Sequence, residues 1–122
     1  MKIGQIKSQL KNANQDINVY FDFCRCVPTF VRSWRGIYAE PALGWEAERY
    51  GGDTVNKTVA QVLEELEKAT DGRKYTGWKG GGFSYNDNDI LHVDNAGECT
   101  NTEIVFIEIN EFYVILHTKL DN

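Results

Sequence analysis

The C-terminal third of the sequence contains two apolar runs separated by a short polar turn, and this pattern strongly constrains the fold. Residues 103–109 and 112–118 are rich in β-branched and aromatic side chains, with Asn110-Glu111 between them. Such runs favour strands, and the polar break predicts a β-hairpin. Because the runs are nearly continuous, they predict strands buried on both faces, by helices on one side and by a partner molecule on the other.

Two segments carry helical signals. Residues 3–13 place apolar side chains at helical spacing, which predicts a short amphipathic helix. Thr58 and Gln61 match a capping box at the start of a second helix, whose apolar stripe runs to Leu66. The pair Asp71-Gly72 predicts the end of this helix, because glycine readily adopts the left-handed conformation that closes helices.

The first half of the chain also carries strand signals. Residues 17–23 alternate between apolar and polar side chains, which predicts a half-buried strand. Pro28 has no backbone N–H, so we expect it to interrupt the pattern, and we expect a second strand over residues 32–38. Residues 39–57 combine proline, glycine and bulky aromatic residues and predict a long irregular loop, a feature that is uncommon without a functional reason.

After the second helix the chain has β character. Residues 74–79 and 83–85 flank Gly80-Gly81-Gly82, which predicts a further hairpin, and residues 90–93 predict a short strand. Together the elements predict an α+β fold with two helices packed on a mostly antiparallel β-sheet. The length of 122 residues predicts a single domain over residues 1–122.

Charge and the N-terminal sequence limit the functional classes. The net charge of −5 at pH 7 argues against DNA binding, which requires a basic surface. The first residues lack the apolar run of a signal peptide, and no stretch is long and apolar enough to cross a membrane. We therefore expect a cytoplasmic protein that has no membrane partner.

Cysteine and histidine do not form a metal-binding pattern. The three cysteines, Cys24, Cys26 and Cys99, are an odd number and suit a reducing compartment. We interpret them as plain thiols, with a redox role for the CxC pair, or a zinc site with His92 and His117, as alternatives. The sequence therefore predicts no metal site and no cofactor.

The chain also lacks the sequence motifs of common catalytic sites. A nucleophile elbow, a zinc-protease helix, a P-loop and a dinucleotide fingerprint are all absent from the sequence. The three glycines at 80–82 lie between two β segments, so no helix N-terminus follows them to bind phosphate. His92 and Asp94 are candidates for acid–base chemistry, and a nucleotide-cleaving enzyme stays open as an alternative.

Aromatic residues make up 12% of the chain, and several of them lie beside cations. Trp34 precedes Arg35, Trp78 precedes Lys79, and Phe83 follows the glycine run. Aromatic faces stack on nucleobases and arginine pairs with phosphate, so this set indicates a nucleotide site.

Two amides extend this set, and a structural alternative accompanies it. Asn95 and Asn101 can donate and accept hydrogen bonds at once, which suits a base edge or a ribose hydroxyl. Trp34 and Trp78 are equally compatible with core packing, with the neighbouring cations extending into solvent. Spacing alone does not decide between these interpretations.

Several longer motifs support one interpretation. They are Asp22-Phe23-Cys24, Val27-Pro28-Thr29, Ser33-Trp34-Arg35-Gly36, Glu40-Pro41-Ala42-Leu43-Gly44, Tyr75-Thr76-Gly77-Trp78-Lys79-Gly80-Gly81, Val93-Asp94-Asn95 and Cys99-Thr100-Asn101-Thr102-Glu103-Ile104. Together they resemble the phage-encoded Thoeris anti-defence proteins of the first, sponge type. The resemblance extends over most of the chain, from about residue 17 to residue 118.

The resemblance implies a specific function. Proteins of this family bind the cyclic ADP-ribose isomer (glycocyclic ADP-ribose) made by bacterial TIR-domain Thoeris sensors and hold it without cleavage, so that the effector is not activated. They act in the cytoplasm of the infected bacterial host, and some also take up cyclic di- or trinucleotides. They form homodimers that can build into hexamers of three dimers, with ligand pockets at subunit contacts. No catalytic residue is expected for such a sponge.

The resemblance and the side-chain chemistry together give six candidate ligand-binding residues. By resemblance, Phe83 stacks on the adenine and Asn95 makes a polar contact. Arg35 and Lys79 are candidates for the pyrophosphate on chemical grounds. The full set is Phe83, Asn95, Arg35, Lys79, Trp34 and Asn101.

A third functional class also stays open. An aromatic-rich surface is typical of protein–protein contacts, so the chain is also compatible with an inhibitor that docks on a host defence protein. Binding that needs no nucleotide would favour this alternative.

Overall fold

The computed structural model describes residues 1–23, 26–34, 37–47, 57–76, 81–94 and 101–121. Within these residues the chain forms two helices and nine strands. In chain order they are α1 (Ile3–Lys11), β1 (Asn18–Phe21), β2 (Cys26–Trp34), β3 (Ile37–Ala47), β4 (Lys57–Thr58), α2 (Val59–Ala69), β5 (Tyr75–Thr76), β6 (Gly82–Phe83), β7 (His92–Val93), β8 (Asn101–Ile109) and β9 (Tyr113–Asp121).

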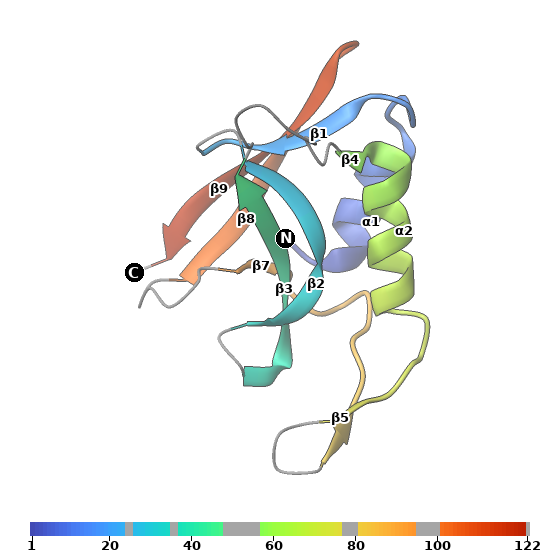
Figure 1. Ribbon diagram of the computed structural model, residues 1–122, viewed down its shortest axis with the longest axis vertical. Helices are drawn as coiled ribbons and strands as arrows, with labels where there is room; N and C mark the ends of the chain where they lie inside the picture. Colours follow the sequence, from blue (N-terminus) through green and yellow to red (C-terminus); the bar gives the residue numbers. More distant parts are fainter. Residues whose placement is uncertain (24–25, 35–36, 48–56, 77–80, 95–100, 122) are drawn as a thin grey trace.

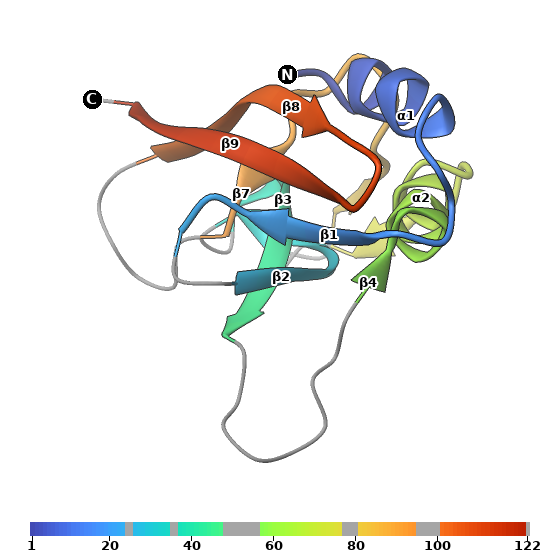
Figure 2. The same cartoon turned by 90° about the horizontal axis from the view of Figure 1, so that it is seen from above.

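Seven of these strands form one curled sheet. Its order is β2-β3-β7-β8-β9-β1-β4, and β5 pairs separately with β6. Pairing is antiparallel except between β1 and β9 and between β3 and β7. The curl brings β1 and β2 into contact, and α2 packs beside them (Figure 2). The predicted α+β fold, with two helices on a mostly antiparallel sheet, is therefore confirmed.

The two helices bury the side chains that their periodicity predicts. Ile3, Ile6 and Leu10 of α1 are fully or almost fully buried. The α2 capping box is present: the Gln61 N–H donates to Thr58 Oγ1 at 3.3 Å, and the Thr58 N–H donates to Gln61 Oε1 at 2.9 Å. An amphipathic stripe with a satisfied first turn explains why both segments form helices at these places.

The predicted end of α2 is confirmed as well. The helix ends at Ala69, and Gly72 takes a left-handed φ of +93° in the turn that follows. Arg73 pairs with Asp71 at 2.9 Å, and this hydrogen-bonded guanidinium lowers the pKa of the Asp71 carboxyl to about 2.

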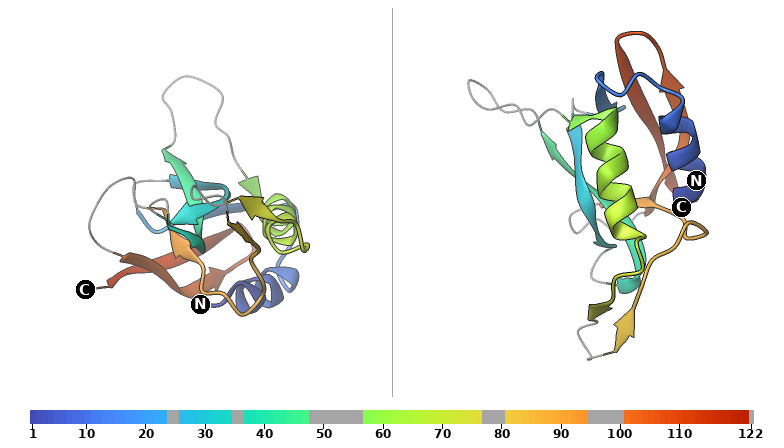
Figure 3. Two further views of the ribbon diagram at one scale, coloured as in Figure 1. Left: turned by 90° about the horizontal axis from the view of Figure 1, so that it is seen from below. Right: turned by 90° about the vertical axis from the view of Figure 1, so that its right-hand side faces the viewer.

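A single core lies between the helices and one face of the sheet. Its buried side chains are Ile3, Ile6, Leu10, Ala13, Val19, Phe21, Cys26, Leu43, Val59, Val62, Leu63, Leu66, Leu91, Val93, Ile104, Ile107, Val114 and Leu116. Figure 3 shows both helices on the same side of the strands. No helix in the described part of the chain is long and apolar enough to cross a membrane.

The expectation that Pro28 interrupts the sheet is wrong. Pro28 lies inside β2 and pairs with Trp45 of β3, and the expected strand over 32–38 is divided between the end of β2 and the start of β3. β2 is at the edge of the sheet order, where a missing N–H costs no ladder bond. The β2–β3 pairing shifts its register between Pro28 and Val31, so the strand continues past the proline.

The expectation of an irregular loop over residues 39–57 is also wrong for its first half. Ile37–Ala47 forms the eleven-residue strand β3, which includes Pro41 and Gly44. Proline and glycine have a low propensity for strands, but β3 pairs with β2 on one side and with β7 on the other, and this pairing stabilises it as a strand. Residues 48–56 lie outside the described residues.

The hairpin of β8 and β9 is confirmed, and burial of its second face by a partner molecule stays a prediction. Ile107 and Val114 face the core, whereas Phe106 is 57% exposed and Phe112, in the turn, is 77% exposed. The helices cover only one face of the sheet, so alternate side chains of the two strands face solvent in the single chain (Figure 3).

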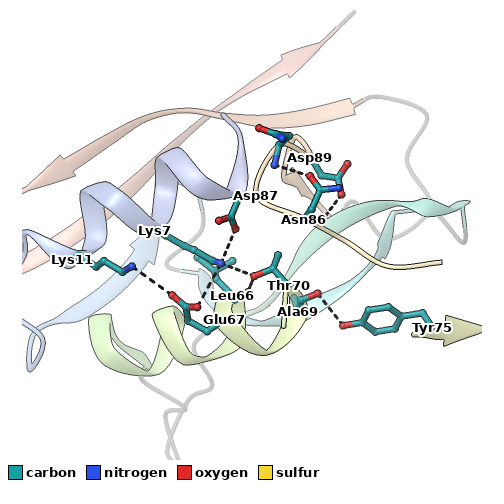
Figure 4. A network of polar contacts seen from close by, with 11 residues as sticks. Lys7, Lys11, Leu66, Glu67, Ala69, Thr70, Tyr75, Asn86, Asp87 and Asp89 are labelled. Atoms are coloured by element: carbon teal, nitrogen blue, oxygen red, sulfur yellow. Dashed lines mark hydrogen bonds and ion pairs between the residues drawn. The ribbon is translucent and has the colours of Figure 1, made fainter. Parts of the chain in front are cut away.

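A buried lysine joins the two helices to the turn after β6. Lys7 is 8% exposed and lies 2.7 Å from Asp87 Oδ1, 2.5 Å from Thr70 Oγ1 and 3.6 Å from Glu67 Oε2 (Figure 4). Thr70 in turn donates to the Leu66 carbonyl at 2.8 Å. Because a buried ammonium group needs such partners, this network fixes α1 against the end of α2.

We predict that Lys7→Ala lowers the free energy of unfolding by about 1–3 kcal/mol, because it removes buried charge-assisted hydrogen bonds. Lys11→Ala is the matched control: Lys11 also pairs with Glu67, at 3.7 Å, but is 62% exposed and should change stability by under about 0.5 kcal/mol. Urea denaturation measures both. Equal losses in the two variants would contradict a structural role for the Lys7 network.

Candidate functional site

Three aromatic rings gather on the small sheet of β5 and β6. The Tyr75 and Phe83 rings are stacked, with centroids 5.4 Å apart and an angle of 21° between their planes. Tyr85 lies 5.1 Å from Tyr75 and 5.4 Å from Phe83. The pairing Tyr75↔Phe83 across the two strands places the rings on one face. We call these three residues the aromatic cluster.

The aromatic cluster is attached to the body of the molecule at the end of α2. Tyr85 is buried, Phe83 is half-buried, and the Tyr75 hydroxyl donates to the Ala69 carbonyl at 3.5 Å. Burial raises the pKa of the Tyr75 phenol. The β5–β6 hairpin projects from the same end of the molecule at which β2 turns into β3 (Figures 1 and 3). An aromatic surface on a projecting hairpin suits stacking against a planar ligand.

A second group of polar residues lies on the sheet face opposite the core. The register connects Arg32 to Ala42, Ala42 to His92, and His92 to Glu103, so these positions form one row across four strands. Leu43 and Val93 are buried in the core. Side chains alternate along strands, so the row faces away from the core.

Arg32 is a cation of this face with contacts to an acidic and to an aromatic side chain. Its Nη1 lies 3.2 Å from Asp94 Oδ2, and its guanidinium lies 4.8 Å from the centre of the Phe30 ring. A Cβ at Gly44 would come within 3.2 Å of Arg32 Nε and 2.5 Å of Thr29 Oγ1. Glycine at position 44 therefore leaves the space in which the Arg32 side chain lies.

His92 and Asp94 are both held by their neighbours. His92 Nε2 lies 3.7 Å from Glu40 Oε2. The Asp94 N–H donates to the Leu43 carbonyl at 3.0 Å, and the Trp45 indole N–H donates to the Asp94 carbonyl. The two candidates for acid–base chemistry thus share one sheet face, and the Asp94 carboxylate forms an ion pair with Arg32.

The structure places three of the six predicted ligand-binding residues. Phe83 belongs to the aromatic cluster, Trp34 ends β2, and Asn101 begins β8. Thr102 pairs with Val93, so Asn101 follows at the ladder position beside Asp94. In the sheet order, β3 and β7 lie between β2, which ends at Trp34, and β8, which begins at Asn101.

The other three predicted residues, Arg35, Lys79 and Asn95, lie outside the described residues. The same holds for Trp78, Cys24 and Cys99. The predicted pyrophosphate contacts of Arg35 and Lys79 therefore stay predictions, as does the polar contact of Asn95.

Sequence reasoning missed two residues of these groups. Tyr75 was not singled out, although its position across the glycine run from Phe83 could have indicated a ring pair. Arg32 is not among the six candidate residues either. Its ion pair with Asp94 has no local signal, because Asp94 is 62 positions away in the sequence, whereas Phe30 lies two positions from Arg32 on the same strand.

A third polar group lies where β1, β8 and β9 meet. His117 Nε2 lies 3.0 Å from Glu108 Oε1, and His117 Nδ1 lies 3.7 Å from Asp22 Oδ2. Asp22 also accepts hydrogen bonds from the N–H and hydroxyl of Thr118, at 2.9 and 2.7 Å. These contacts tie the end of β1 to β9. Among the described residues, no group of His, Cys, Asp or Glu side chains converges to hold a metal ion.

Comparisons with known proteins identify no relative of the chain. No protein-family model, no curated protein and no solved structure matches it.

We predict that Phe83→Ala lowers the pKa of the Tyr75 phenol toward its ordinary value of 10.0, because removal of the stacked ring exposes Tyr75 to water. An NMR pH titration of the tyrosine ring signals measures this shift. Ser84→Ala changes the exposed neighbour of Phe83 and should leave the Tyr75 pKa unchanged. An unaltered Tyr75 pKa in Phe83→Ala would show that the rings do not shield each other in solution.

Proposed function

We propose that this protein binds and sequesters a cyclic ADP-ribose isomer, the glycocyclic signal of bacterial Thoeris defence, without cleaving it. In this role it acts in the cytoplasm of an infected bacterial cell and keeps the signal from its effector. Cyclic di- or trinucleotides are further candidate ligands. The aromatic cluster carries the proposal, because Phe83 is the residue that the family resemblance assigns to adenine stacking and it lies beside Tyr75.

The polar sheet face supports the same proposal. Arg32 provides a cation that can pair with phosphate, and Asp94 and Glu40 provide carboxylates that can accept hydrogen bonds from ribose hydroxyls. Adenine, ribose and phosphate are the parts of a cyclic ADP-ribose molecule. A tight site needs all three to be buried, which two copies of the chain can achieve at a shared contact.

An enzyme that cleaves the nucleotide is the main alternative, since His92 and Asp94 share one face. The pairing of Asp94 with Arg32 favours binding over base catalysis, because the carboxylate is engaged by the guanidinium at 3.2 Å. Incubation of the protein with the cyclic nucleotide, followed by heating, should return the intact nucleotide. Linear ADP-ribose in the supernatant would instead establish an enzyme.

The aromatic cluster gives a direct binding prediction. Phe83→Ala should weaken nucleotide affinity roughly 5- to 150-fold, since a stacked base contributes about 1–3 kcal/mol. Isothermal titration calorimetry measures the affinity, and Ser84→Ala serves as the control that keeps the three rings. Equal affinity of Phe83→Ala and the unmodified protein would remove the aromatic cluster from the site.

We also propose that the chain associates with itself through the β8–β9 hairpin. Five large apolar side chains are exposed on this hairpin and its turn, namely Val105, Phe106, Ile109, Phe112 and Tyr113. Exposed apolar residues concentrated on one hairpin are typical of a protein contact surface. A host defence protein is the alternative occupant of this surface.

Light scattering coupled to size exclusion distinguishes the two occupants. The unmodified chain should elute as a dimer or hexamer at micromolar concentration, and Phe112→Ser should shift it toward monomer because it removes the most exposed of the five side chains. Glu111→Gln, at the neighbouring exposed position, is the control. A monomer at every concentration would contradict self-association.

A further inference from the structure

We infer that Arg32 is a binding site for a phosphate group, and that the Asp94 carboxylate occupies the position of that phosphate in the ligand-free protein. The inference deepens the proposed function and rests on it for the identity of the ligand. It assigns the phosphate contact to a residue other than Arg35 and Lys79. Its basis is the arrangement of Phe30, Gly44 and Asp94 around one guanidinium.

The Arg32 side chain is held in place but stays accessible. The Phe30 ring supports it at 4.8 Å, and the absent side chain of Gly44 leaves room for its Nε. Even so, 47% of the Arg32 side chain is exposed. An arginine that is already ordered loses little conformational entropy when it binds a ligand, and its planar fork matches two oxygens of a phosphate.

Asp94 presents a carboxylate where a phosphate would bind. Its Oδ2 lies 3.2 Å from Arg32 Nη1, so it occupies the side of the guanidinium on which a phosphate oxygen would bind. Its main chain is held independently, because its N–H donates to the Leu43 carbonyl and its carbonyl accepts the Trp45 indole N–H. The carboxylate can therefore rotate away from Arg32 while the backbone of Asp94 stays fixed.

The neighbouring charges explain why such an internal carboxylate is useful. Glu40 lies on the same region of the sheet, paired with His92 at 3.7 Å, and the whole chain carries a net charge of −5. An unoccupied guanidinium would attract any cellular anion. A tethered carboxylate competes with weak single-contact anions, whereas a nucleotide that also stacks on an aromatic ring can displace it.

Two substitutions of opposite expected effect test the inference. Arg32→Gln should weaken the binding of inorganic pyrophosphate at least about 10-fold, because a charged hydrogen bond is lost. Asp94→Asn should strengthen it several-fold, because the competing negative charge is replaced by a neutral amide, whose hydrogen bond from Arg32 is weaker. Arg73→Gln is the control, since Arg73 is similarly exposed and pairs with Asp71 away from this face.

Each variant is titrated with pyrophosphate and, in a separate experiment, with the cyclic nucleotide. Calorimetry and the NMR signal of the Arg32 Nε–H monitor binding, and circular dichroism verifies that each variant is folded. Opposite effects of Arg32→Gln and Asp94→Asn on pyrophosphate support the inference, whether or not the cyclic nucleotide binds. Unchanged pyrophosphate affinity in Arg32→Gln, or weaker affinity in Asp94→Asn, overturns it. If pyrophosphate affinity is unchanged in Arg32→Gln and the nucleotide binds the unmodified protein and this variant equally, the inference fails and the proposed function stands.

Discussion

The apolar faces of α1 and α2 pack against one face of the seven-stranded sheet, and this contact positions every polar group described above. Because the helices take the inner face, side chains such as Arg32, His92 and Asp94 are directed to the outer face by strand alternation. The same contact leaves the outer side of the β8–β9 hairpin open. One hydrophobic layer thus determines which residues can meet a ligand and which can meet another protein.

The helices and hairpins could be predicted because their signals are local. The Thr58 capping box, Gly72 after α2, and the turn at Asn110 each depend on residues within a few positions of one another. β3 could not be predicted in this way. Pro41 and Gly44 are poor strand formers, and this segment becomes a strand because β2 and β7 pair with it from both sides.

The residues of the candidate site also divide into those with a local sequence signal and those that depend on long-range contacts. Phe83 is a candidate through the family resemblance, and its stacking with Tyr75 follows from a short-range strand pair. Arg32 depends on contacts with β3 and with Asp94 after β7, which only the assembled sheet brings together. The apolar content of β8 predicts burial on both faces, with a partner molecule on the second face, and in the single chain Phe106 on β8 is 57% exposed.

We propose that two regions of the molecule, the aromatic cluster and the polar face around Arg32, together contact one nucleotide. The account requires both to respond to the same ligand, in one chain or across two copies. Chemical-shift mapping of the labelled protein with the cyclic ADP-ribose isomer tests this most directly. The account predicts that the ring signals of Tyr75 and Phe83 and the Arg32 Nε–H shift together with one saturation curve. Shifts confined to the β8–β9 hairpin, or none at saturating ligand, would contradict it.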